Sequence, residues 1–340
     1  MQSSNDLRGL ARKIGFDPDY LEAFEQKLFI SGPQTAQRLT NFFGLLLLAT
    51  VIATFGVISD STATVIGAMI VAPLMGPIMA TAAAVVMGST QRALRSLALV
   101  FVGIVCVILL SSLLAFSVPD VLISYQENGE IASRIAPGLL ALLTALASGA
   151  AGAYITSREE IADSMGGVAI AISLVPPLCV VGISINQGQW SAASGALMLF
   201  LTNFLAILLA GGITFMIGGL GRLAISDAHQ RMRRNAFAMI VVATLLIAIP
   251  LSMTSYQVID HSLENRAAIQ DIKDWLAETT HQVVKVDVND QTGEATIKGY
   301  GELRPLRQLA NALADTLGRP ITVDLRTIPS QSEVSGAETE

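Results

Sequence analysis

The run from Ser164 to Gly221 contains no charged side chain, and this constrains the fold more than any other feature of the sequence. A helix needs about 20 apolar residues to span a bilayer, so a run of this length requires two crossings. The polar stretch Asn186-Gln187-Gly188-Gln189 supplies the turn between them. Only 14% of all residues are charged, against about 25% in soluble domains. The sequence therefore predicts an α-helical polytopic membrane protein.

Seven apolar segments are long enough to cross a membrane. They cover residues 41–59, 62–88, 94–118, 136–155, 165–185, 192–220 and 236–254. The first segment follows the polar residues 1–40, whereas a cleavable signal peptide has its apolar region much closer to the start. We therefore expect an uncleaved first helix that acts as its own insertion signal.

Arginine is distributed unevenly between the loops that join these segments. With seven spans, seven arginines fall in loops on the side of the N-terminus, and the opposite loops carry Arg134. The seven are Arg92, Arg95, Arg158, Arg222, Arg231, Arg233 and Arg234. Basic loops stay in the cytoplasm, so we expect a multi-pass protein of the plasma (inner) membrane, with a cytoplasmic N-terminus and an extracytoplasmic C-terminal domain. An even number of spans would require one apolar run to be re-entrant.

The net charge of −6 comes from the end of the chain. Residues 256–340 hold eight basic and fourteen acidic side chains, whereas residues 1–40 and 41–255 are each balanced. We expect a cytoplasmic helical segment over 1–40, a transmembrane domain over 41–255, a water-exposed domain over 256–328 and a disordered tail over 329–340. The sequence lacks the basic excess of nucleic-acid-binding proteins, so we expect no nucleic-acid partner.

Two proline-interrupted segments are related by a constant offset of 103 residues. Within DSTATVIGAMIVAPLMGPIMA (60–80), residues 60–79 align without a gap to DSMGGVAIAISLVPPLCVVG (163–182). The identities are Asp60 with Asp163, Ser61 with Ser164, Val65 with Val168, Ala68 with Ala171 and Pro73 with Pro176. Because three spans separate the copies, this predicts a 3+3 inverted repeat, with halves near 41–118 and 136–221 and a seventh span after them. Paired broken helices in such folds point to a site near the middle of the membrane.

The prolines predict where these two helices break. Pro73 and Pro77, with Gly76 between them, interrupt the first segment, and adjacent prolines interrupt the second. A proline lacks an N–H and displaces the carbonyl four residues earlier. We expect altered backbone at Pro176 and Pro177 and freed carbonyls at Met69, Pro73, Ile172 and Ser173. Such carbonyls suit a cation and half-helix N-termini suit an anion, while a simple structural kink is the alternative.

The acidic pairs before these segments have two interpretations. As N-caps, Asp60-Ser61 and Asp163-Ser164 would satisfy the first amides of their helices. As pathway residues, they would form two acidic mouths that concentrate cations. No ionisable group lies deep in a predicted span, which argues against a buried carboxylate proton relay.

Polar and small residues mark two further spans. Thr202 and Asn203 lie near the middle of segment 192–220, where hydrogen bonding between helices and lining of a pathway are both open. Residues 148–152, SGAAG, have the spacing that permits close helix packing, within the chain or between subunits. Whether the protein forms a homo-oligomer therefore stays open.

The two ends of the chain have their own patterns. Leu21, Phe24 and Leu28 share one face of a short helix that would lie on the membrane or on the bundle. The tail predicts a small α+β domain in the order αββαβ. Its elements are a helix at 257–279, strands at 282–289 and 294–300, a helix at 304–317 and a strand at 320–328. Val284, Val286 and Val288 should face the same way. This order, with GYGEL at 299–303, resembles the BON-type module of extracytoplasmic proteins.

At the broken segments the chain resembles a known family. VIGAMIVAPLMGPIMA (65–80) and AIAISLVPPLCVVGI (169–183) are similar to the signature stretches of the membrane proteins grouped as domain of unknown function 389. The resemblance covers roughly residues 35–225 and implies a prokaryotic polytopic membrane protein. It implies no substrate and no catalytic residue.

The leading hypothesis is a membrane transporter or channel for a small ion or solute, with a midplane site between segments 62–88 and 165–185. A cation is slightly favoured. The alternative is a membrane-anchored sensor or scaffold whose outer domain binds a ligand or an envelope partner. An enzyme is disfavoured because His229, His261 and His281 all lie outside the spans and no zinc-binding pattern occurs. We expect no metal and no cofactor, and as partners the lipid bilayer and the transported species.

Overall fold

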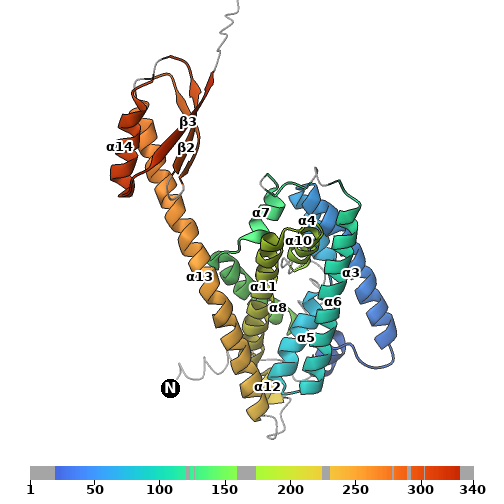
Figure 1. Cartoon of the computed structure of the whole chain (residues 1–340). Helices are drawn as coiled ribbons and strands as arrows, with labels where there is room; N and C mark the ends of the chain where they lie inside the picture. The colour runs from blue at the N-terminus through green and yellow to red at the C-terminus, as the bar shows by residue number, and fades with distance from the viewer. Residues whose placement is uncertain are drawn as a thin grey trace, which may run out of the picture. The chain divides into compact units, whose positions relative to one another are not determined.

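The computed structural model describes residues 20–119, 123–125, 127–158, 174–223, 230–277, 279–288, 292–301 and 303–329. The chain divides into two compact units, Met1–Thr254 and Ser255–Glu340, and Figure 1 labels most of the elements of both. The helices of the first unit are α2 (Leu21–Leu28), α3 (Thr35–Ile58), α4 (Thr62–Val71), α5 (Met75–Val86), α6 (Thr90–Phe116), α7 (Gly129–Ile135), α8 (Leu139–Thr156), α10 (Val175–Asn186), α11 (Trp190–Ile217) and α12 (Leu220–Leu223). A long helix, α13 (Gln230–Trp275), continues into the second unit.

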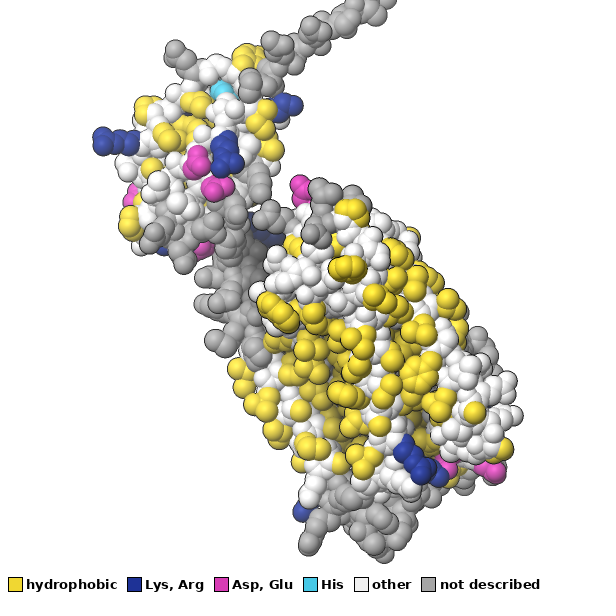
Figure 2. Space-filling model, turned by 45° about the vertical axis from the view of Figure 1, so that its right-hand side comes forward, with side chains coloured by type: hydrophobic (Ala, Val, Ile, Leu, Met, Phe, Trp, Pro, Cys, Tyr) yellow, Lys and Arg dark blue, Asp and Glu magenta, His cyan; other side chains and the backbone are white. Residues whose placement is uncertain are grey.

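Four helices are long and apolar enough to cross a membrane: α3, α6, α8 and α11. A fifth span is present if the bent pair α4 and α5 counts as one. Among the described residues, α10 and the apolar stretch Arg234–Ile249 are shorter, and the first half of the predicted segment 165–185 lies outside those residues. Figure 2 shows hydrophobic side chains over a broad face of this unit, with charged side chains toward its ends. The apolar helices indicate a membrane protein.

Close helix contacts hold the bundle together. The predicted tight packing at residues 148–152 is confirmed within the chain, because a Cβ on Gly149 would lie 2.7 Å from the Ile207 Cα of α11. A Cβ on Gly182 of α10 would collide with Ser111 of α6. Interhelical packing through small residues lets backbones approach and gain dispersion contacts where no hydrophobic force acts between helices.

The pair α5 and α6 has the same plan as the pair α10 and α11. Both α5 and α10 have 12 residues, and α6 and α11 have 27 and 28. Each connection contains a glycine with positive φ, 71° at Gly88 and 67° at Gly188. The N–H of Ser89 donates to the Ala84 carbonyl at 2.9 Å, and that of Gln189 donates to the Ser184 carbonyl at 2.8 Å. These are the 6→1 bonds of a Schellman ending, where glycine adopts left-handed backbone without strain.

The two pairs correspond at an offset of 100 residues, since α5 and α10 begin at residues 75 and 175 and α6 and α11 begin at 90 and 190. This offset places Pro77 and Pro177 at the third position of their helices. The predicted offset of 103 instead matches Pro73 with Pro176. The difference arises because the identities at offset 103 lie at residues 60–73, before α5 begins at residue 75.

The helices α6 and α11 run in opposite directions. Gly195, near the start of α11, lies against the Ile135 backbone at the end of α7, which follows α6. Gly212, near the end of α11, lies beside Val86 at the end of α5, which precedes α6. Figure 1 likewise shows α7 and α12 at opposite ends of the bundle.

The second unit is a three-stranded sheet with helices packed on it. Its elements after α13 are β1 (Gln282–Val288), β2 (Thr292–Gly299), α14 (Leu306–Leu317) and β3 (Thr322–Pro329), so the predicted order is confirmed. β1 pairs antiparallel with β2, and β2 pairs parallel with β3. Ile272 and Trp275 of α13 and Leu309 and Leu313 of α14 are buried in its core. Arg319 makes two hydrogen bonds to the Glu264 carboxylate, at 2.8 and 2.7 Å.

Two predictions for this part of the chain are wrong. The predicted separate helices 236–254 and 257–279 belong to the continuous α13, because no glycine or proline interrupts residues 251–275. Val284 does not share a face of β1 with Val286 and Val288, although the alternation predicts that it does. It is 56% exposed, and Val283 packs against the core in its place. A register shift between Val283 and Lys285 is the cause, since an extra residue reverses the alternation of side chains.

Candidate functional site

The predicted break in the second apolar segment is confirmed. α4 and α5 are separated by residues 72–74 and are bent by 49°. Pro73 has no N–H, so the Met69 carbonyl loses the partner that a continuous helix would supply. Ala72 still donates to the Ala68 carbonyl at 3.0 Å, which keeps α4 helical up to the proline.

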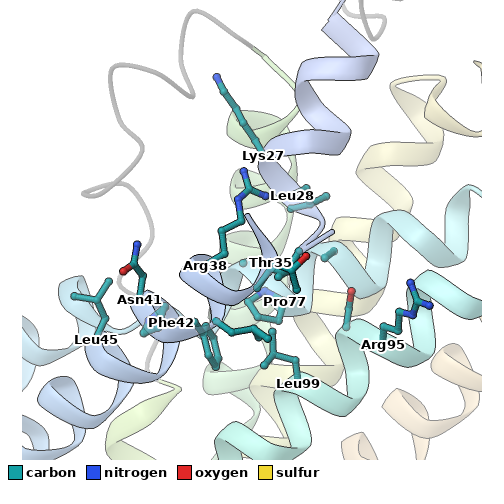
Figure 3. A pocket seen from close by; sticks show the side chains of 16 residues that line it. Lys27, Leu28, Thr35, Arg38, Asn41, Phe42, Leu45, Pro77, Arg95 and Leu99 are labelled. Atoms are coloured by element: carbon teal, nitrogen blue, oxygen red, sulfur yellow. The ribbon is translucent and has the colours of Figure 1, made fainter. Parts of the chain in front are cut away.

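A pocket of about 480 Å³ opens at this break. Pro73, Gly76 and Pro77, three of the predicted pathway residues, contribute to its lining. The remaining walls come from α2, the first turns of α3 and the start of α6 (Figure 3). The break therefore lies at a pocket that other parts of the bundle also line.

The pocket combines an apolar interior with a basic rim. Phe42, buried to 6% exposure, and Leu99 lie beside Pro77 in the interior. Lys27 and Arg95 lie at the rim, and their charged ends point outward in Figure 3. Arg38 is the third basic residue, and no carboxylate of the described residues lines the pocket. Its charge is the opposite of what the predicted preference for a cation requires.

Arg38 fixes α2 as a wall of the pocket. Its Nη1 donates to the Gln26 carbonyl at 2.5 Å and to the Phe29 carbonyl at 3.0 Å. The last carbonyls of a helix have no partner within the helix, and a guanidinium is well suited to bind them. A side chain near the start of the first span thus holds the end of α2.

Aromatic packing also fixes α2. Phe24 is 1% exposed and meets the Phe215 ring of α11 edge to face, with centroids 5.8 Å apart. Glu25 forms an ion pair of 2.9 Å with Arg92, whose guanidinium lies over the Phe29 ring. Of the two predicted positions for this helix, on the membrane or on the bundle, the second is the one observed.

Gly76 faces open space. A Cβ at this position would meet no described atom within 4 Å, and Gly76 has ordinary helical backbone rather than a positive φ. Because Gly76 also lines the pocket, a larger side chain there would change the pocket wall without straining α5. Gly67 of α4 has the same properties but does not line the pocket.

Asp60 and Ser61 cap two different helices. Ser61 is the N-cap of α4, with its Oγ 3.4 Å from the Thr64 nitrogen, so this part of the N-cap interpretation is confirmed. Asp60 has a φ of 52°, and its Oδ1 accepts a hydrogen bond of 2.8 Å from the Glu130 N–H at the start of α7. The carboxylate therefore serves a helix that the sequence interpretation did not consider.

A buried ion pair lies beside this cap. Glu130 is 7% exposed, accepts a hydrogen bond from Thr62 at 2.5 Å and pairs with Arg134 at 2.8 Å. Asn128 caps α7 through the Ile131 N–H and donates to the Val57 carbonyl, at 2.8 and 2.7 Å. Arg134, the lone arginine of the predicted outer loops, is thus neutralised within the fold.

The second predicted break is described only from its C-terminal side. Asp163, Ser164, Ile172 and Ser173 lie outside the described residues. Pro176 and Pro177 occupy the first turn of α10, where the missing N–H groups cost little, and both are buried. Neither lines the pocket at the first break.

The other predicted pathway residues lie apart from the pocket. Met69 is half-buried and packs against a cluster that includes Val57 and Val65. Thr202 and Asn203 are 1% and 5% exposed, and Thr202 donates to the Met198 carbonyl of its own helix at 2.7 Å. The structure therefore brings together three of the predicted residues, from the first break.

Sequence reasoning missed the residues that give the pocket its charge. The sequence places Lys27 and Arg38 in a polar N-terminal segment, and the position of Arg95 indicates only the orientation of the chain. A signal was present, because Arg38 lies three residues before the first apolar segment, 41–59. That Arg38 lies beside the break depends on the packing of α2 and α3 against α5, which periodicity does not specify.

Residues 69–209 match the family model described as Domain of unknown function (DUF389). The chain is also similar to a Methanocaldococcus jannaschii protein described as uncharacterized, with 32% identity over 205 residues. This alignment covers 60% of the chain and 62% of the relative. No solved structure matches the chain. The matched region contains the break between α4 and α5 and the two prolines of α10, while Lys27 and Arg38 lie before the matched residues.

Proposed function

We propose that the protein is a membrane transporter or channel for a small ion or solute, whose pathway passes the break between α4 and α5. The observation that carries this proposal is the pocket at Pro73, Gly76 and Pro77. Broken helices survive in a membrane where they line a cavity or lie against protein. A helix that served only as an anchor would not need such a break.

A 3+3 inverted repeat with seven spans is part of the proposal. The matched plans and opposite directions of α5–α6 and α10–α11 support it. In such folds the substrate site lies near the interface of the repeats, and one repeat moves against the other. The same topology has the N-terminus in the cytoplasm and a BON-like C-terminal domain outside the cell.

Flux into proteoliposomes tests the proposal. The purified protein would be reconstituted and assayed against a panel of small cations and anions. The Gly76→Leu variant should reduce flux at least tenfold, because its side chain fills the pathway, and Gly67→Leu should not. A Pro73→Ala/Pro176→Ala variant should also change the flux, since Pro73→Ala restores an N–H donor at the break between α4 and α5.

Absence of flux for every ion, from protein shown to be folded and inserted, would reject this function. The sensor or scaffold alternative would then lead, and the outer domain would become the place to look for a ligand.

A further inference from the structure

We propose, on the basis of the proposed function, that the pocket between α2, α3, α5 and α6 takes an amphipathic anion. The phosphate or carboxylate head would lie at the basic rim and the apolar body in the interior. This assigns a ligand class to the site and reverses the cation preference drawn from the sequence.

Among the described residues, the charged side chains that line the pocket are basic. Lys27, Arg38 and Arg95 place three basic side chains in the lining of the pocket, and no Asp or Glu of the described residues is among the lining residues. Glu25, the nearest acid on α2 in sequence, is paired with Arg92 at 2.9 Å. A site with this balance repels cations and attracts anions, more strongly at low ionic strength.

The broken helix adds a second positive feature. α5 starts in the pocket wall, where Gly76 and Pro77 occupy its first turn. Pro77 has no N–H and the Ile78 N–H donates to the Leu74 carbonyl at 3.4 Å, so Met75 and Gly76 supply the amides of this turn. The partial positive charge at a helix N-terminus favours an anion. Because Pro73 interrupts the span, this helix end lies within the chain's apolar segment rather than at its boundary.

The interior restricts the ligand further. Phe42, Pro77 and Leu99 provide apolar surface that could not replace the hydration shell of a small inorganic ion. An apolar body would gain by displacing water from the same surface. A volume of about 480 Å³ is within the range of pockets that hold small organic ligands.

Two sources could supply this chemistry: a soluble organic anion, or the head group and first methylenes of an anionic phospholipid. Basic pockets between membrane helices on the cytoplasmic side are known to bind lipid head groups. The shared chemistry is an anionic head joined to an apolar chain, and the experiment below separates the sources.

Binding is measured on the full chain in phosphatidylcholine nanodiscs. Octyl phosphate is the probe, and inorganic phosphate, octyl glucoside and octyltrimethylammonium are the comparisons. Octyl phosphate should raise the melting temperature saturably and bind at least tenfold more tightly than each of the others. Equal binding of octyl glucoside, or tighter binding of octyltrimethylammonium, would overturn the proposal.

Variants locate the binding. Gly76→Leu should weaken octyl phosphate at least tenfold, and Gly67→Leu should not. Arg95→Gln, at an exposed rim residue, should weaken it about threefold to fivefold, while Arg307→Gln on α14 should have no effect. Unchanged affinity in both pocket variants would place the binding elsewhere and contradict the proposal. Arg38 is left unchanged because it also holds α2.

Nanodiscs containing phosphatidylglycerol identify the source. If the lipid occupies the pocket, it will compete with octyl phosphate in wild type, and native mass spectrometry will detect bound lipid that Gly76→Leu loses. If the ligand is soluble, octyl phosphate will bind equally in both discs after correction for surface charge. Binding of octyl phosphate without flux of any ion would reject transport and support the anion site. Selective flux of cations through the pocket would support transport and contradict the anion site.

Discussion

Asp60 accepts a 2.8 Å hydrogen bond from the Glu130 backbone N–H, which joins the turn after α3 to the first turn of α7. The two residues are 70 positions apart in the sequence. Asp60, an acid directly before a broken helix, therefore joins two segments of the bundle. Its φ of 52° is the left-handed conformation that Asp and Asn tolerate better than other non-glycine residues.

Replacing Asp60 should therefore affect stability. Asp60→Ala removes the cap and places a poorly suited residue at positive φ, at an expected cost of about 1–3 kcal/mol. Asp60→Asn keeps an acceptor and tolerates the backbone, so its cost should be smaller. Thermal unfolding of the purified variants measures both. If Asp60→Asn abolished flux while leaving the melting temperature unchanged, the acidic-mouth interpretation would be correct instead.

The contact between Gly149 and Ile207 predicts a second stability effect. Gly149→Ala places a methyl group 2.7 Å from the Ile207 Cα, so α8 and α11 must separate, at about 1–3 kcal/mol. Gly44→Ala on α3 is the matched control, because its methyl group meets no described atom within 4 Å and alanine favours a helix. Equal melting temperatures for the two variants would show that the helices are not in this contact.

Phe24 should determine whether α2 stays on the bundle. Truncation of a buried phenylalanine costs about 3–5 kcal/mol. A helix of 8 residues is not stable in water without tertiary contacts, so α2 depends on this packing. Phe24→Ala should release α2 while the membrane helices stay folded. Hydrogen exchange of residues 21–28 should rise sharply, and Glu22→Ala, at an exposed position, should leave it unchanged. Protection equal to wild type in Phe24→Ala would show that α2 is held by other contacts.

Tyr125 gives a pH-dependent test outside the membrane helices. Burial raises the pKa of Tyr125 above its usual value of about 10, although its 3.2 Å hydrogen bond to Ser184 acts in the opposite direction. With a raised pKa in the folded state, the unfolded chain loses this proton first. The contribution of the protonated Tyr125 hydroxyl to the stability of the folded state is therefore complete below about pH 10. It is lost as the pH rises through the folded pKa.

The measurement compares the melting temperatures of wild type and Tyr125→Phe between pH 8 and pH 11. The wild type should lose more stability than the variant above about pH 10. Parallel curves for the two proteins would mean that the hydroxyl is not buried in the fold.

Features set by local patterns were predictable from the sequence. The apolar runs predicted α3, α6, α8 and α11, and the prolines predicted the break between α4 and α5. Alternation and turn residues predicted the order of elements in the second unit. The exception there is Val284, where a register shift reversed the predicted face, and sequence alternation carries no sign of it.

Features set by packing between distant segments were not predictable. Nothing local places Arg38 beside the Phe29 carbonyl, or the Asp60 carboxylate at the start of α7. The charge of the candidate site was misjudged for this reason. The acids that suggested a cation were near the breaks in sequence, whereas the bases that line the pocket come from α2, α3 and α6.

The most direct test of the central claim is flux through matched glycine variants in proteoliposomes. We predict selective flux in wild type and Gly67→Leu, and at least a tenfold loss in Gly76→Leu with its melting temperature unchanged. Equal flux in all three proteins would show that the pathway does not pass the break at Pro73, and would contradict the account.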